Sequence, residues 1–521
     1  MEETPFELSR RETLVVVAGL MVGLSLAALD GTIVATALPT IVGDLGGLDQ
    51  LSWVVTSYLL ASTAATPLFG RLSDLYGRRR LFQVAIIIFI VGSMLAGVSQ
   101  TMLQLILARG VQGVGGGGVM AMCFSIIGDI IPARERGRYT GFFTATFAAA
   151  SVAGPLLGGF FVDTLTWRWI FYINLPLGLV ALFVTSHVLR RVPFRRQDHR
   201  IDFLGAALMV AAVSSTMLVA VWGGAEYAWS SGVITGLASA AVILTVTFVL
   251  HERRVPEPIL PLRLFGNSVA AVCFAISFLL GAVMFAATSF LPLFLQIVTG
   301  ASATNSGLLI VPLMGGLTIA SIITGRRITA TGRYRIYPIV GTALCTVGVA
   351  LLSQMGTDTS RFYSSVSMAI VGYGVGMTMP TLSLAAQNAV SGRDLGVVTS
   401  ATTFFRSLGG ALGVALFGAV LTARTNAELD RQLPVGTLID RDTLLSSPAK
   451  IRELPAELAG PVTDAIAEGV TAAFVVAVPV VAAAFGFAWF LREVPLRKTG
   501  NLTGSVTQSE PGVALTEPPL L

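Results

Sequence analysis

Long apolar stretches separated by short polar loops dominate this chain. Fourteen of these stretches approach the roughly 20 residues that an α-helix needs to cross a bilayer. Backbone inside lipid must satisfy its own hydrogen bonds, so each stretch is predicted to be a helix. A membrane β-barrel would show alternating segments of about ten residues, which continuous apolar runs such as 81–95 exclude. The predicted spans are 14–36, 51–70, 81–99, 103–125, 139–162, 168–188, 203–222, 231–250, 268–295, 304–325, 336–354, 362–385, 397–422 and 470–491.

The basic residues predict how the helices are oriented. With the N-terminus in the cytoplasm, 25 of the 34 lysine and arginine residues fall on the cytoplasmic side. Seven fall outside, five of them in one long loop at 423–469, while Arg109 and Arg406 fall within spans. Because basic loops favour the cytoplasmic side, we expect both termini there. Lysine occurs only at Lys450 and Lys498, a usage typical of GC-rich bacteria, so the expected location is the bacterial cytoplasmic membrane.

The composition excludes several other classes of protein. Of 521 residues, 54% are hydrophobic and 12% are charged, with a mean hydropathy of +0.78. So few charged residues cannot cover a soluble domain, and so many apolar ones exclude a disordered chain. The three cysteines, an odd number in apolar segments, predict neither a disulfide framework nor a metal site. The net charge of +5 comes from short loops between apolar runs, so no nucleic-acid partner is expected.

A loop rich in glycine and arginine occurs twice. The segment GRLSDLYGRRR recurs 255 residues later as GRRITATGRYR, with both glycines and three arginines superimposed. The same offset takes Gly154 and Gly158 to Gly409 and Gly413. Duplicated halves that hold substrate between them are typical of transporters. The expected parts are a six-helix half at 1–190, a two-helix insert with linkers at 191–266, a second six-helix half at 267–492 and a disordered cytoplasmic tail at 493–521.

Four segments resemble signature motifs of one transporter family. Residues 70–80 are similar to the loop between helices two and three of the major facilitator superfamily. Residues 29–39, 107–113 and 154–159 resemble motifs in the first, fourth and fifth helices of its fourteen-span drug:proton antiporters. The resemblance implies an all-α integral membrane protein with the major facilitator fold, in which two inserted helices separate two six-helix halves. It also implies multidrug efflux by alternating access and a role in antibiotic resistance.

Asp30 is the candidate proton carrier. It is the only acidic residue predicted well inside a span, where a carboxylate costs at least ~2.5–3.5 kcal/mol on insertion scales. Arg109 is predicted at the same depth, because each residue lies about six residues, or ~9 Å, from the outer end of its span. Arginine does not lose its proton, so we expect Arg109 to hold the charge of Asp30 in one conformation and release it in another. The alternative is a static structural ion pair.

The predicted substrate cavity is apolar and has few polar groups. Gln112 shares the helix face of Arg109, and either binds substrate or links helices. Arg406 lies near mid-depth without a predicted acidic partner, and either meets substrate or binds backbone carbonyls. The aromatic candidates for the cavity are Phe143, Phe147, Phe285 and Phe404.

The first of the two repeated loops is the candidate gate. Charged groups there can favour helix ends or bind acidic lipid, and glycines permit close approach of helices. The second loop has Thr329 where the first has Asp74, so only the first is expected to form the full charge-based gate. Basic loops that serve orientation alone are the alternative. The predicted gating residues are Gly70, Asp74, Gly77, Arg78 and Arg79.

The fifth span contains the candidate antiporter segment, Gly154, Pro155, Gly158 and Gly159. Small residues bring helices close together and proline bends them. The resemblance assigns this segment to blocking leak, and tight packing without any effect on direction is the alternative.

The energy source is expected to be a proton gradient. The chain contains no Walker sequence, so neither ATP nor another cofactor is expected, and we expect neither a metal nor an enzymatic activity. Expected partners are protons, membrane lipids and small hydrophobic or amphipathic compounds, with the protein acting as a monomer. One aspartate against two arginines in the spans does not favour a strongly cationic substrate. The alternative function is an exporter or flippase of an endogenous lipid or metabolite.

Overall fold

The residues that the structure describes are mostly helical. The computed structural model describes residues 10–45, 51–131, 133–188, 202–224, 226–256, 258–298, 309–391, 394–432 and 455–496. Ten of the helices in these ranges are long and apolar enough to cross a membrane by length and composition. Large apolar side chains also point outward, as expected of surfaces that face lipid. Examples are Leu103, Leu107, Phe183, Ile243 and Phe362.

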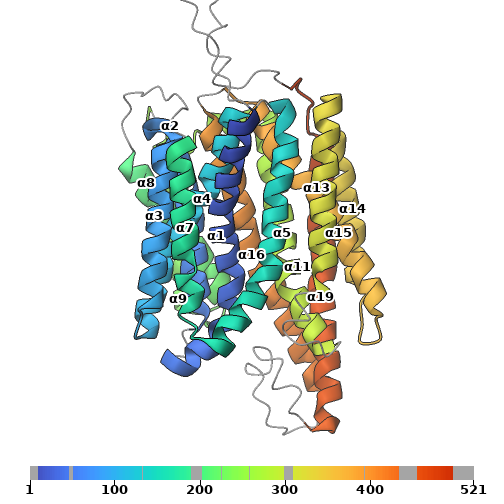
Figure 1. Ribbon diagram of the computed structural model, residues 1–521. Coiled ribbons are helices and arrows are strands. Elements are labelled where there is room, and N and C mark those ends of the chain that lie inside the picture. Colours follow the sequence, from blue (N-terminus) through green and yellow to red (C-terminus); the bar gives the residue numbers. More distant parts are fainter. Residues whose placement is uncertain are drawn as a thin grey trace, which may run out of the picture.

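Two groups of helices make up the bundle, with two helices between them in the sequence (Figure 1). The first half contains α1 (Arg10–Leu45), α2 (Leu51–Tyr76), α3 (Arg78–Gly97), α4 (Met102–Ile130), α5 (Ala133–Thr164), α6 (Trp169–Tyr172) and α7 (Asn174–Val188). The insert contains α8 (Phe203–Trp222) and α9 (Gly232–Glu252), and α10 (Arg263–Gly266) follows it. The second half contains α11 (Ser268–Val298), α13 (Val311–Thr331), α14 (Ile336–Leu352), α15 (Arg361–Asn388), α16 (Leu395–Gln432) and α19 (Ala456–Trp489).

The two halves meet along two seams. Helix α2 packs against α16, and α5 packs against α13. The inserted helices α8 and α9 pack on each other, and α8 contacts both α2 and α16 from the outside of the first seam. We call the face where α1 begins and α19 ends the terminal face, and the opposite one the distal face (Figure 1).

The internal repeat has a conformational counterpart. Gly77 and Gly332, which the 255-residue offset superimposes, have positive φ angles of 93° and 73°. Such angles favour glycine, which has no Cβ to clash with the backbone. Both loops therefore place a glycine of positive φ between two helices, although the ψ angles differ, at 140° for Gly77 and 0° for Gly332.

The prediction of a long loop at 423–469 is wrong over much of its length. Helices α16 and α19 continue far beyond the predicted spans 397–422 and 470–491, and they project together from the distal face (Figure 1). Arg424 on α16 pairs with Glu468 on α19 at 2.6 Å. Apolar residues such as Ile466 are buried in this projection, because each helix covers the apolar side of the other. The mixed composition of 423–469 therefore belongs largely to amphipathic helices, and only 433–454 lies outside the described residues.

Some predicted segments fall outside the described residues. These are the tail beyond residue 496, the linker up to residue 201 and the first residues of the predicted span 304–325, of which the structure describes residues 309–325.

Candidate functional site

Asp30 on α1 and Arg109 on α4 form a buried ion pair. Arg109 Nη1 donates to Asp30 Oδ2 at 2.5 Å. The two residues are 0% and 1% exposed, so neither contacts solvent or lipid to a useful extent. The structure thus brings together the two residues that matching depth in the sequence predicts to meet.

Gln112 completes a triangle with this pair. Arg109 Nη1 donates to Gln112 Oε1 at 2.7 Å, and Gln112 Nε2 donates to Asp30 Oδ1 at 2.7 Å. Arg109 and Gln112 are three residues apart on one helix, so both side chains reach the same carboxylate. Gln112 is fully enclosed here, and it therefore links helices in this conformation instead of lining an open cavity.

The sequence analysis missed four further residues of this site. Asn174, at the start of α7, lies 3.4 Å from Asp30 Oδ1 and donates to Ser93 on α3 at 2.9 Å. The Arg109 guanidinium lies 4.3 Å from the ring centre of Tyr58 on α2, and its Nε donates to the Val54 carbonyl at 3.3 Å. Asn174 is the only asparagine among residues 1–190, a signal that could have identified it.

Glycines allow the helices around the ion pair to approach closely. A Cβ at Gly92 on α3 would lie 2.6 Å from the Gln112 Cα, closer than side chains pack. A Cβ at Gly113 on α4 would lie 3.0 Å from the Tyr58 Cα. Helix α4 is thereby held against both α2 and α3, which fixes the backbone that carries Arg109 and Gln112.

The predicted gating residues occupy different environments. Gly70 faces the other half, since a Cβ there would lie 2.5 Å from the Ser400 Cβ on α16. Arg78 Nε pairs with Asp129 Oδ2 at 2.7 Å, within the first half. Arg79 Nε is buried without a hydrogen-bond partner among the described residues. The side chain of Asp74 lies outside the described residues.

Two of the four predicted antiporter residues pack against α1, just beyond Asp30. A Cβ at Gly154 would lie 2.7 Å from the Thr32 Cβ, and one at Gly158 would lie 3.0 Å from the Ile33 carbonyl oxygen. Gly159 has no such neighbour within 4 Å, and the side chain of Pro155 lies outside the described residues. Helices α1 and α5 therefore depend on Gly154 and Gly158 for their close contact.

A polar contact joins the halves at the terminal face. Arg136 on α5 donates from Nη1 to Gln387 Oε1 on α15 at 3.0 Å, and from Nε to the Ile131 carbonyl at 2.7 Å. Gln387 in turn donates to Thr399 on α16 at 3.0 Å. Together with the approach of Gly70 to Ser400, this contact closes the bundle at the terminal face. The sequence analysis did not identify Arg136 or Gln387 as functional residues.

The predicted cavity phenylalanines are mostly packed among other side chains. Phe143 is 1% exposed and packs edge to face with Phe124. Phe404 is buried beside Phe405, Phe285 packs against Gly410, and Phe147 is partly buried.

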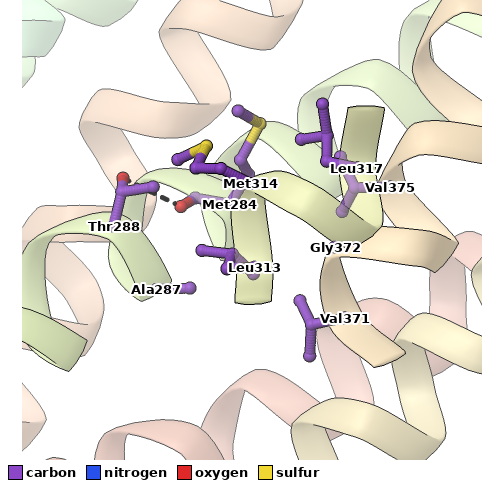
Figure 2. Close-up of a pocket in the computed structure, with 9 residues that line it drawn as sticks. All are labelled: Met284, Ala287, Thr288, Leu313, Met314, Leu317, Val371, Gly372 and Val375. Carbon is purple, nitrogen blue, oxygen red and sulfur yellow. Dashed lines mark hydrogen bonds between the residues drawn. The ribbon is translucent and has the colours of Figure 1, made fainter. Parts of the chain in front are cut away.

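An apolar pocket lies instead among α11, α13 and α15 of the second half (Figure 2). None of the predicted phenylalanines lines this pocket. Its one hydroxyl, that of Thr288, donates to the Met284 carbonyl at 3.0 Å and is therefore already satisfied. The lining residues are Met284, Ala287, Thr288, Leu313, Met314, Leu317, Val371, Gly372 and Val375.

Comparison with known proteins gives the family. Residues 20–414 match the model of the Major Facilitator Superfamily. The chain belongs to this superfamily. It is 41% identical over 482 residues to an uncharacterized MFS-type transporter of Mycobacterium tuberculosis, covering 92% of this chain and 70% of that protein. It is also 41% identical over 449 residues to the multidrug transporter protein MdtP of Bacillus subtilis, covering 85% and 80%. Multidrug resistance protein 3 of the same bacterium is 40% identical over 408 residues, covering 78% and 79%.

Solved structures confirm the predicted fold. The human organic anion transporter MFSD10 superimposes with a TM-score of 0.63 at 14% identity, covering 92% of this chain and all of that one. The proton:xylose symporter XylE superimposes with a TM-score of 0.60 at 13% identity, covering 96% and 100%. Identities this low show the fold alone. The protein is thus a multi-pass membrane transporter of the major facilitator fold, with multidrug efflux proteins among its relatives.

Proposed function

We propose that this protein exports hydrophobic or amphipathic compounds from the bacterial cytoplasm in exchange for protons. The observation that carries the proposal is the enclosed carboxylate of Asp30, bonded to both Arg109 and Gln112. Relatives named as multidrug transporters support the substrate class. The distribution of basic residues supports an orientation in which the terminal face is cytoplasmic.

Proton binding to Asp30 would change the charge of the site. The Asp30–Arg109 pair is neutral, and a proton on the carboxylate leaves the guanidinium without a counter-charge. Breaking a buried pair in this way costs about 3–5 kcal/mol. A conformation in which Arg109 finds water or another partner is then favoured, so protonation biases the equilibrium between two states.

The closed terminal face fits one stage of an alternating-access cycle. Here Arg136 meets Gln387 and Gly70 meets Ser400, so the cytoplasmic side would be sealed. In the opposite stage these contacts would separate as the two halves rock about the seams. Since Asp30 is fully enclosed in the present conformation, proton exchange requires that movement.

The substitution Asp30→Asn tests the proposal. Asparagine preserves the size of the side chain and one of its two acceptor oxygens but carries no ionisable group, so we expect folding and membrane insertion to persist while proton exchange is lost. The measurement is substrate-induced proton flux in proteoliposomes, across ethidium and a panel of uncharged and anionic amphipathic compounds. Asp44→Asn is the matched control, because Asp44 is exposed near the end of the same helix. Normal proton flux in the Asp30→Asn protein would contradict the proposed coupling.

A further inference from the structure

Arg406 on α16 is a half-buried cation that has no bonded partner among the described residues. Across the residues that the structure describes, no carboxylate lies in ion-pair range of its guanidinium and no carbonyl accepts from it. Arginine carries five N–H donors, and donors left unbonded inside a protein are unfavourable. Arg109, by contrast, is held by Asp30, Gln112 and a backbone carbonyl. The charge of Arg406 is therefore available to something other than this protein.

Tight helix packing fixes the position of this charge. A Cβ at Gly281 on α11 would lie 3.0 Å from the Arg406 carbonyl carbon, and one at Gly409 would lie 2.7 Å from that of Phe278. Since α11 and α16 touch through their backbones here, the Arg406 side chain is directed elsewhere. Its guanidinium lies 5.9 Å from the ring centre of Phe124 on α4. The charge thus sits at the boundary between the two halves.

One aromatic pair lies beside Arg406. Phe124, whose ring centre lies 5.9 Å from the guanidinium, packs edge to face with Phe143 at 5.5 Å between ring centres. The contact of Ser400 with Gly70 lies six residues away along α16, about 9 Å nearer the terminal face. One positive charge beside an aromatic pair, just inside that closure, complements a compound with one acidic group and an apolar body.

We propose that Arg406 determines specificity by binding the acidic group of the transported compound, so that the preferred substrates are amphipathic organic anions. The proposal rests on the proposed function and names its substrate class. A small inorganic anion would pair with the guanidinium but would leave the Phe124–Phe143 pair unused. An organic cation would meet uncompensated positive charge. A membrane potential that is negative inside would also assist the exit of an anion.

Two dansyl probes that differ only in charge test the proposal. They are 11-(dansylamino)undecanoic acid and its methyl ester, titrated by fluorescence against the full-length protein in nanodiscs, with empty nanodiscs as the blank. We expect the protein to bind the acid about tenfold or more tightly than the ester, as for one charge-assisted hydrogen-bonded pair. Arg406→Gln should remove this preference by weakening the acid alone, and Arg406→Lys should keep part of it. Arg361→Gln, at an exposed helix start, should change neither affinity.

Equal affinity of the unmodified protein for acid and ester would overturn the assignment, and so would a preference that survives in Arg406→Gln. If Arg406→Gln does not fold, the affinities of the unmodified protein and of Arg406→Lys for the acid and the ester still test the assignment. Proton flux with the same two probes in proteoliposomes tests the proposed function separately. An acid preference without any proton flux would contradict proton exchange while keeping Arg406 as the anion site. Proton flux with the ester, together with equal affinity for acid and ester, would support proton exchange and contradict Arg406 as the anion site.

Discussion

Gly92 on α3 lies directly against the backbone of Gln112 on α4, the residue that holds both members of the buried ion pair. A methyl group at position 92 has no room, because the Gln112 Cα is a backbone atom and cannot rotate away. We expect Gly92→Ala to separate the two helices and to lower the free energy of unfolding by about 1–3 kcal/mol. Thermal unfolding of the purified protein measures the loss of stability, and proton flux measures the effect on the site.

Gly110→Ala is the matched control for this substitution. Gly110 neighbours Arg109 on the same helix, but a Cβ there would meet nothing within 4 Å. Alanine is the better helix former, so stability should be unchanged or slightly higher. Equal destabilisation by Gly92→Ala and Gly110→Ala would show that helix contact at Gly92 is unimportant.

Gly154→Ala tests the contact of α5 with α1 beside the proton site. A Cβ at Gly154 would lie 2.7 Å from that of Thr32, whose hydroxyl donates to the Ala150 carbonyl at 3.2 Å. If packing there seals the path to Asp30, the substitution should loosen the two helices and raise proton flux in the absence of substrate several-fold. Gly159→Ala, which meets no neighbour, should leave proton flux unchanged. Identical behaviour of the two variants would contradict a sealing role.

Removing the contact of Arg136 with Gln387 should open the terminal face. A hydrogen bond from a charged donor contributes about 1.5–3 kcal/mol, so Gln387→Ala should shift the population toward the open state by about tenfold or more. Spin labels at exposed positions 80 and 326, one in each half, would report a longer distance. The three native cysteines are buried and should not interfere with labelling.

Gln354→Ala is the control for this experiment. Gln354 is exposed just beyond the end of α14 and takes no part in the contact, so its loss should leave the distance between the labels unchanged. An unchanged distance distribution in Gln387→Ala as well would show that other contacts hold the terminal face closed.

The contribution of ionised Asp44 to stability should depend on pH. Its Oδ2 accepts from Trp167 Nε1 at 2.9 Å and from Arg168 Nη1 at 3.0 Å, and these bonds hold the pKa of Asp44 below its ordinary value. The folded-state pKa is thus lower than the unfolded one. The resulting stabilisation is present above about pH 4 and is lost as the pH falls through the folded-state pKa. The difference in Tm between the unmodified protein and Asp44→Asn should therefore shrink in acid, and a constant difference would contradict this assignment.

The equal predicted depths of Asp30 and Arg109 within their spans were enough to predict the ion pair. Positions along two spans can be compared by counting residues from the membrane surface, and a buried charge is costly enough to require a partner. Asn174 and Ser93 could not be predicted in this way, because neutral polar residues are common in membrane helices and do not demand one. Which face each helix turns toward its neighbours depends on packing, and packing is not encoded in distance along the chain.

The projecting ends of α16 and α19 could not be predicted from hydropathy. Arg424, Glu428 and Glu468 make these segments appear polar when averaged, whereas in three dimensions they lie beside buried residues such as Leu429 and Val462. A hydropathy average detects helices that contact lipid. It does not detect two amphipathic helices that cover each other's apolar sides outside the bilayer.

The unbroken length of α16 makes it a lever arm. Arg424 lies 24 residues beyond Ser400, about 36 Å along the helix axis. If the end near Gly70 acts as the pivot, a tilt of about 10° would carry the tip of α16, together with the paired Glu468, through about 6 Å. Small rotations inside the bundle would thus become large displacements outside it, where a bound antibody fragment could arrest the cycle without touching the transport path.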